Sequence, residues 1–145
     1  MADTLSRQRR SENMARIRSQ DTQPELFVRS LLHRAGFRFR LHSKRLPGKP
    51  DIVLPRFKTV VFVHGCLWHG HENCRRGRRP KSNADYWNRK IDRNLIRDAA
   101  NALLLREAGW RRIVVWECEL KRPESILKRI ILGLNEESST TAAAA

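Results

Sequence analysis

Three cysteines and one histidine have the residue types and the spacing of a metal site. Cys66, His71 and Cys74 stand close together in one polar segment, and Cys118 lies much further along the chain. Three thiolates and one imidazole make a complete tetrahedral set for Zn²⁺, and such a closed site is structural because no coordination position remains for water. The alternative is three buried cysteines and a surface histidine, which does not explain the short spacing.

An aspartate and two other histidines form a second group that could carry chemistry. If the two apolar runs around Leu54 and Thr59 pair as a hairpin with those two residues opposite, Asp51 comes to lie beside the chain that precedes His64. His69 is restricted too, because the proposed zinc ligands bracket it. A carboxylate at a strand start suits Mg²⁺, and neighbouring imidazoles can transfer protons or stabilise a phosphorane. Asp51 could instead be an ordinary turn residue after Gly-Lys-Pro.

Two further acids are weaker candidates for the same chemistry. Glu25 fits the third helical position of a capping box that begins at Thr22. Asp98 fits a solvated charge beside Arg97 on a helix. From the residues alone, these local structural roles are favoured for both acids.

Large apolar side chains occur where a DNA-contacting loop or arm would carry them. Leu67 and Trp68 stand on the segment that the metal would make rigid, and Met14 and Ile17 stand in a basic N-terminal segment. They could be small pieces of core, or a wedge that enters a base stack, as DNA-deforming proteins use. The residues alone favour neither interpretation.

Hydrophobic periodicity predicts the elements that position these residues. They are a helix from Thr22 to before Gly36, a strand over 37–41, a hairpin of 51–54 and 59–63, a loop over 64–83, a helix from Asp85 to Gly109, a strand over 112–116, and a helix opened by Pro123. The expected buried stripe of the long helix is Trp87, Ile91, Leu95, Ala99, Ala102 and Leu103. This order predicts an α/β fold in which a mixed sheet is flanked by helices.

Length and charge restrict the function further. The 145 residues fit one domain, which excludes a second catalytic domain. We expect a basic N-terminal arm over 1–20, a domain over 21–134 and a disordered tail over 135–145. The formal net charge of +15, with basic clusters in the arm and over 38–49 and 75–81, predicts a polyanionic partner.

Targeting signals are absent from the sequence. No apolar run approaches the roughly 20 residues of a membrane span, and the first residues lack the apolar stretch of a secretory signal. We therefore expect a cytoplasmic protein that associates with the nucleoid.

Several of these motifs together resemble one protein family. Pro50-Asp51, the run from Phe62 to Cys74 (FVHGCLWHGHENC) and Val115-Trp-Glu-Cys118 are similar to the very-short-patch-repair (Vsr) DNA mismatch endonucleases. The run from Ser11 to Ile17 and the run from Thr22 to Glu25 match that family's N-terminal pattern. The resemblance covers roughly residues 6–134.

The resemblance implies a restriction-endonuclease-like fold and a Mg²⁺-dependent nick on the 5′ side of the thymine in a T:G mismatch. It implies that Asp51 binds Mg²⁺ together with the Val63 carbonyl. The other implied roles are metal-bound water or proton transfer for His64, His69, Glu25 and Asp98, structural zinc binding for Cys66, His71, Cys74 and Cys118, and DNA intercalation for Met14, Ile17, Leu67 and Trp68.

Two other functions stay open beside this one. The first is a restriction-like or structure-specific DNA endonuclease without T:G selectivity, and the second is a zinc-stabilised nucleic-acid-binding module without catalysis. The resemblance also implies mismatch-repair accessory proteins as possible partners. Because one strand is cut at an asymmetric lesion, we expect the protein to act on double-stranded DNA as a monomer.

Overall fold

A computed structural model describes residues 21–144 of the chain, with side chains up to residue 135. The helices and strands are α2 (Gln23–Arg34), β1 (Arg40–Leu41), β2 (Ile52–Leu54), β3 (Thr59–His64), α3 (Ala84–Glu107), β4 (Arg111–Trp116) and α4 (Pro123–Ala144). Three short 3-10 helices are η1 (Pro55–Phe57), η2 (Arg75–Gly77) and η3 (Glu117–Lys121). The predicted order of helices and strands and the mixed α/β class are confirmed for the described residues.

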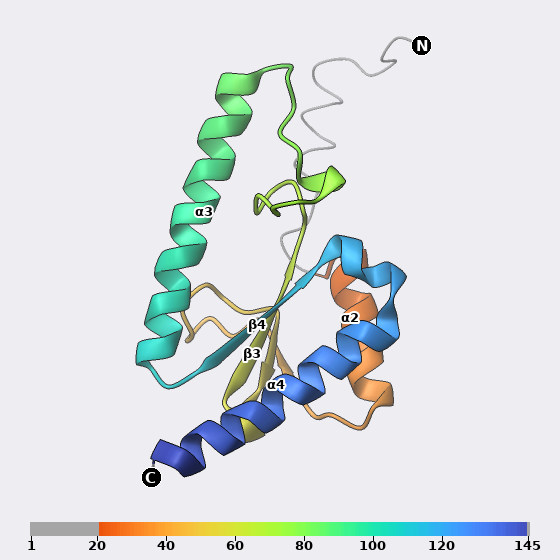
Figure 1. The fold of residues 1–145 in the computed structure, drawn as a ribbon, viewed down its shortest axis with the longest axis vertical. Coiled ribbons are helices and arrows are strands. Elements are labelled where there is room, and N and C mark those ends of the chain that lie inside the picture. Colours follow the sequence, from red (N-terminus) through yellow and green to blue (C-terminus); the bar gives the residue numbers. More distant parts are fainter. Residues whose placement is uncertain (1–20, 145) are drawn as a thin grey trace.

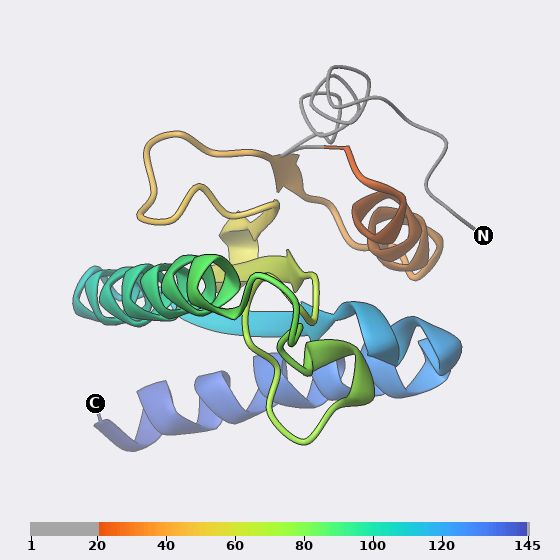
Figure 2. The ribbon, with the colours of Figure 1, turned by 90° about the horizontal axis from the view of Figure 1, so that it is seen from above.

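The four strands form one mixed sheet in the order β1-β2-β3-β4, with helices on both faces (Figure 1, Figure 2). Helices α2 and α4 cover one face, where their apolar side chains pack on alternate residues of the sheet. This first core cluster contains Val28, Leu32, Ile52, Leu54, Val61, Ile113, Val115, Ile126, Ile130 and Leu134. On the other face Leu105 of α3 packs against Val53, Val60 and Phe62. Strand alternation therefore builds one core on each face of the sheet.

The register of the strands fixes the edge at which the candidate residues meet. Leu54 pairs with Thr59, as the hydrophobic pattern predicts, and Lys58 closes the turn with a left-handed φ of 48°. Strand β4 runs parallel to β3, and α3 is the crossover between them. Because the two strands are parallel, His64 and Trp116 lie side by side where β3 and β4 both end.

The strand predicted over 37–41 is shorter in the structure, where β1 spans only Arg40–Leu41. Phe37 and Phe39 still pack on the first core cluster, while the arginines after them are exposed. The predicted alternation of burial is therefore correct for residues 37–40, but it fails at Leu41, which is 42% exposed. The ladder is short because β2 offers backbone partners only to the last two residues of the segment.

The buried stripe predicted for α3 is wrong in part. Ile91 is fully buried, but Leu95 and Leu103 are 38% and 57% exposed. The face that turns inward instead passes through Ile91, Asp98 and Leu105. Polar residues lie on this face because, as described below, part of α3 lines an open cleft rather than the core.

Helix α4 begins at Pro123 as predicted and continues to Ala144, so it includes residues that the sequence assigns to a disordered tail. The alanines after Thr141 have the highest helix propensity of any residue, and adding a residue to an existing helix avoids the cost of nucleation. The predicted arm over 1–20, with Met14 and Ile17, lies outside the described residues. In the described part of the chain no helix is both long and apolar enough to cross a membrane.

Candidate active site and metal centre

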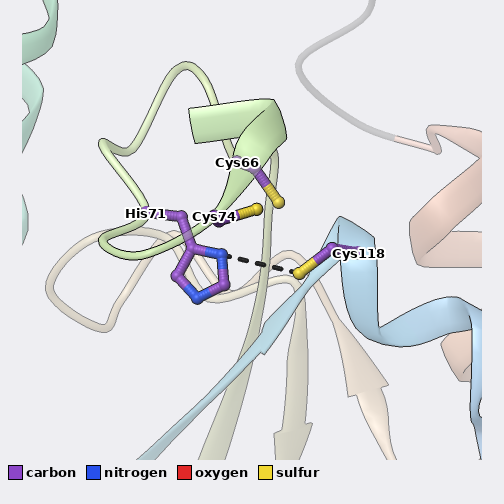
Figure 3. Close-up of side chains that lie close together, drawn as sticks. All are labelled: Cys66, His71, Cys74 and Cys118. Atoms are coloured by element: carbon purple, nitrogen blue, oxygen red, sulfur yellow. Dashed lines mark hydrogen bonds between the residues drawn. The ribbon is translucent and has the colours of Figure 1, made fainter. Parts of the chain in front are cut away.

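The four predicted metal ligands come together at the ends of β3 and β4 (Figure 3). One donor atom from each of Cys66, His71, Cys74 and Cys118 lies within 4.8 Å of all the others. The Cys118 Sγ is 3.5 Å from the His71 Nδ1. Cys66 follows β3 and Cys118 follows β4, so the parallel pairing of these strands brings together residues that are far apart in the sequence.

The chemistry of this donor set fits a bound cation. Cys66 is 1% exposed, and burial raises the pKa of its thiol to about 12. A metal ion supplies the positive charge that allows such a thiol to ionise and ligate. Gly77 lets the loop close, because a side chain there would collide with the backbone carbonyl of His71. The described thiols form no disulfide, so all three are available as ligands.

A cleft of about 1170 Å³ opens beside this centre. The residues that line it include all the acids and histidines predicted to be catalytic. These are Glu25 of α2, Asp51 before β2, His64 at the end of β3, His69 in the following loop, and Asp98 of α3. Val63 lines the same cleft. The structure thus brings together in one place residues that are distant in sequence.

Asp51 is held by the strand that it faces. The backbone N–H of Val63 donates to the Asp51 Oδ2 at 2.7 Å. In an extended strand the N–H and C=O of one residue point to the same side, so the Val63 carbonyl faces the side on which Asp51 lies. Burial, reinforced by the negative charge of Glu25, raises the pKa of Asp51 to about 7. A partly buried carboxylate beside another acid is a suitable ligand for a hard divalent cation.

The two cleft histidines stack on one another and have different partners. Their ring centroids are 3.7 Å apart and their planes differ by 5°. His64 is only 5% exposed, and burial together with the nearby His69 lowers its pKa to about 3, so its imidazole is neutral. The His69 Nδ1 lies 2.6 Å from the Asp98 Oδ2. This contact fixes the Nδ1 proton and leaves the His69 Nε2 to accept a proton.

Asp98 therefore has a role that the sequence alone did not favour. Its partial burial raises the pKa of its carboxyl, but the hydrogen bond from His69 outweighs this and holds that pKa below its usual range. The acid is thus the ionised partner of an imidazole rather than a solvated helix charge. Asp98 follows His69 by 29 positions, which explains why no local pattern revealed the pair.

Glu25 is likewise more than a capping residue. Its backbone N–H lies 3.4 Å from the Thr22 Oγ1, as the capping box predicts, but its Oε2 accepts from the N–H of Asp21. The side chain is buried, and the guanidinium of Arg29 lies 3.2 Å from the same oxygen. The Nε2 of His42 lies 3.6 Å from it. Sequence reasoning missed both residues, although Arg29 follows Glu25 by four positions on the same helix, a spacing that brings two side chains together. No such local spacing links His42 to Glu25.

The two apolar residues of the metal-bearing loop lie outside both core clusters. Leu67 and Trp68 are half-buried. The ring centroids of Trp68 and Trp87 are 5.2 Å apart. The Lys90 Nζ lies over the Trp68 ring, 5.2 Å from its centroid, in a cation–π contact. Leu67 and Trp68 are therefore part of neither main core cluster, while the contact of Trp68 with Trp87 is that of a small satellite cluster.

Lys49, from the predicted basic segment 38–49, lines the cleft, but most of its positive charge comes from residues that sequence reasoning did not single out. Lys90 and Arg97 of α3 and Arg112 of β4 line its walls. For Lys90 and Arg97 the sequence does hold a signal, because positions 90, 94, 97 and 98 share one face of a helix and so predict that these two cations lie beside Asp98. In the predicted basic segment 75–81, by contrast, two arginines are paired with acids: Arg76 with Glu117 and Arg79 with Asp92.

Comparison with known proteins gives consistent matches. Residues 2–76 match the model of the family described as DNA mismatch endonuclease Vsr. The chain is 56% identical over 120 residues to the type II nicking enzyme V.XorIIP of Xanthomonas oryzae pv. oryzae, covering 83% of this chain and 88% of that enzyme. It is 48% identical over 130 residues to the type II nicking enzyme V.NmeAIP of Neisseria meningitidis, covering 90% and 92%. Identity to the DNA mismatch endonuclease Vsr of Escherichia coli is 38% over 137 residues, covering 94% and 87%.

Proposed function

Because the chain belongs to the Vsr family of DNA endonucleases, we propose that it nicks double-stranded DNA in a Mg²⁺-dependent reaction on the 5′ side of the thymine in a T:G mismatch. The observation that carries the proposal is that Asp51 and the His69–Asp98 pair line one cleft. On this proposal the mixed sheet is a restriction-endonuclease-like core, with its catalytic groups at the end of β3.

Asp51 is the proposed ligand of Mg²⁺, together with the Val63 carbonyl. The buried Glu25 lies against Asp51 and would hold a metal-bound water. Bound Mg²⁺ would polarise the scissile phosphate and lower the pKa of a water molecule. The chain itself supplies a fixed, partly dehydrated pair of carboxylates that strengthens the attraction for a dication.

His69 is the proposed general base. Its Nδ1 is bonded to Asp98, which orients the ring and stabilises the imidazolium that forms when Nε2 takes a proton. His64 is neutral, and its buried ring stacks on the ring of His69. Its proposed role is therefore to pack against His69 and to hydrogen-bond water rather than to carry charge. Lys90, Arg97 and Arg112 provide positive charge for the DNA phosphates.

The Cys66, His71, Cys74 and Cys118 cluster is the proposed structural zinc site. Three sulfur donors and one nitrogen suit Zn²⁺ rather than Mg²⁺. The cluster joins the ends of β3 and β4 and thereby fixes the loop that carries His69. Zinc would thus act on the reaction only by ordering the chain.

The DNA contacts follow from the same arrangement. Leu67 and Trp68, outside the core, are the proposed wedge at the mismatch, with Met14 and Ile17 of the arm. We propose that one monomer suffices, that mismatch-repair accessory proteins assist it, and that it works in the cytoplasm at the nucleoid, where chromosomal DNA lies.

A nicking assay tests the function. Labelled duplexes that differ only in a central T:G, T:A or C:G pair are incubated with Mg²⁺, and the cut position is mapped on both strands. We expect a nick on the 5′ side of the mismatched thymine only, and none with Asp51→Asn. Equal nicking of the three duplexes would instead support an endonuclease without T:G selectivity. Binding without any Mg²⁺-dependent cut would support a binding module.

A further inference from the structure

A continuous column of rings connects the metal centre to the catalytic cleft. The His71 imidazole lies flat on the Trp116 indole, with ring centroids 4.0 Å apart and an interplanar angle of 7°. The indole meets His64 edge to face, at 5.3 Å and 75°. His64 in turn stacks on His69. The column thus runs from a proposed zinc ligand to the proposed general base.

Trp116 is well fixed in the middle of this column. It pairs directly with His64 in the register of β3 and β4, so both backbones are held by the same ladder. The backbone N–H of Trp116 donates to the Glu119 Oε1 at 2.9 Å. Arg129 holds that carboxylate, with 2.8 Å to each oxygen. The indole therefore has a rigid support on its backbone side and a metal ligand against one face.

We propose that Trp116 is a positioning residue for the nicking reaction: its indole packs against the His64 ring and so holds the stacked His64–His69 pair in place. The inference rests on the proposed function of the cleft. His64 makes ring contacts with Trp116 on one side and with His69 on another, so removing the indole leaves space into which the pair can shift. A displacement of about 1 Å in a catalytic group can cost about 100-fold in rate.

Trp116→Leu and Trp116→Phe test this role, with Trp110→Leu as the matched control. Leucine removes the ring, whereas phenylalanine keeps an aromatic ring between His71 and His64. Trp110 lies just before the same strand and packs on the second core cluster, and among the described residues it is not one that lines the cleft. For each variant, kcat and KM on the T:G duplex, the zinc content and the imidazole proton signals of His64 are measured.

We expect Trp116→Leu to lower kcat by about 10- to 100-fold with KM within about threefold and zinc content unchanged. Trp116→Phe and Trp110→Leu should stay within about threefold of wild type. In Trp116→Leu the nuclear Overhauser contact between His64 and His69 should weaken, whether or not the duplex is nicked. A wild-type kcat in Trp116→Leu would overturn the proposal, as would a loss of kcat that accompanies zinc loss or that equals the loss in Trp110→Leu. If the wild type itself does not nick, the proposed function fails, while an unchanged His64–His69 contact in Trp116→Leu still refutes the positioning role.

Discussion

Replacing Asp51 with asparagine should stabilise the protein while abolishing its activity. The carboxylate is partly buried and lies beside the buried Glu25, and both features raise its pKa to about 7 from an ordinary value of 3.8. Asparagine keeps an oxygen that can accept the Val63 N–H and has nearly the same shape. The substitution therefore removes an unfavourable charge with little change in packing.

The pKa difference gives the size and the sign of the effect. A folded-state pKa above the unfolded value means that the folded chain binds the proton more tightly between about pH 4 and pH 7. Wild-type stability consequently falls as pH rises through this window, and the asparagine variant lacks that loss. At ~1.36 kcal/mol per pKa unit the full difference is about 4 kcal/mol. The free energy of unfolding of Asp51→Asn should equal that of wild type near pH 4, and it should exceed the wild-type value most above pH 8.

Urea unfolding measured across pH 4–9 without added Mg²⁺, and with zinc retained, checks this prediction. Asp92→Asn is the control, because Asp92 is 57% exposed and forms an exposed ion pair with Arg79. This substitution should change the free energy of unfolding by no more than about 0.5 kcal/mol. The electrostatic argument would be refuted if Asp51→Asn raised the free energy of unfolding by less than about 1 kcal/mol at pH 8. It would also be refuted if this increase did not grow with pH. Nicking at the wild-type rate would refute the metal-binding role.

Three other substitutions probe the metal centre, the acid-holding network and the core. Cys118→Ser should reduce the zinc content below one ion per chain, as measured by metal analysis. A structural zinc contributes about 10–16 kcal/mol of apparent binding free energy to folding, and the variant should lose several kcal/mol of it, which would lower the thermal unfolding temperature. Arg29→Met should cost about 3–5 kcal/mol in urea unfolding, because it leaves a buried carboxylate without its cation. The exposed Arg34→Met should change little. Ile130→Ala, at a side chain 1% exposed, should cost about 2–5 kcal/mol, and Ile131→Ala, at 40% exposed, far less; equal losses would contradict the assigned packing.

Some parts of the site could not be read from sequence because they depend on long-range packing. Asp98 and Glu25 have sufficient local explanations as a helix charge and a capping residue. Their surroundings in the cleft come from His69 beside Asp98 and from Asp51 and His42 beside Glu25, which local spacing does not predict. The orientation of α3 was missed for the same reason. A helix that lines a cleft need not turn its most apolar stripe inward.

The sequence by itself determined the features that local spacing controls. It specified the set of possible metal ligands, the order of helices and strands, and the hairpin register that places Asp51 beside the end of β3. Only the tertiary structure decided that His64 and Trp116 stand side by side, and that Asp98 reaches His69 across the cleft. The physical reason is that alternating burial fixes strand register over a few residues. The parallel pairing of β3 with β4 and the path of α3 are instead decided by how the two faces of the sheet bury their apolar side chains together.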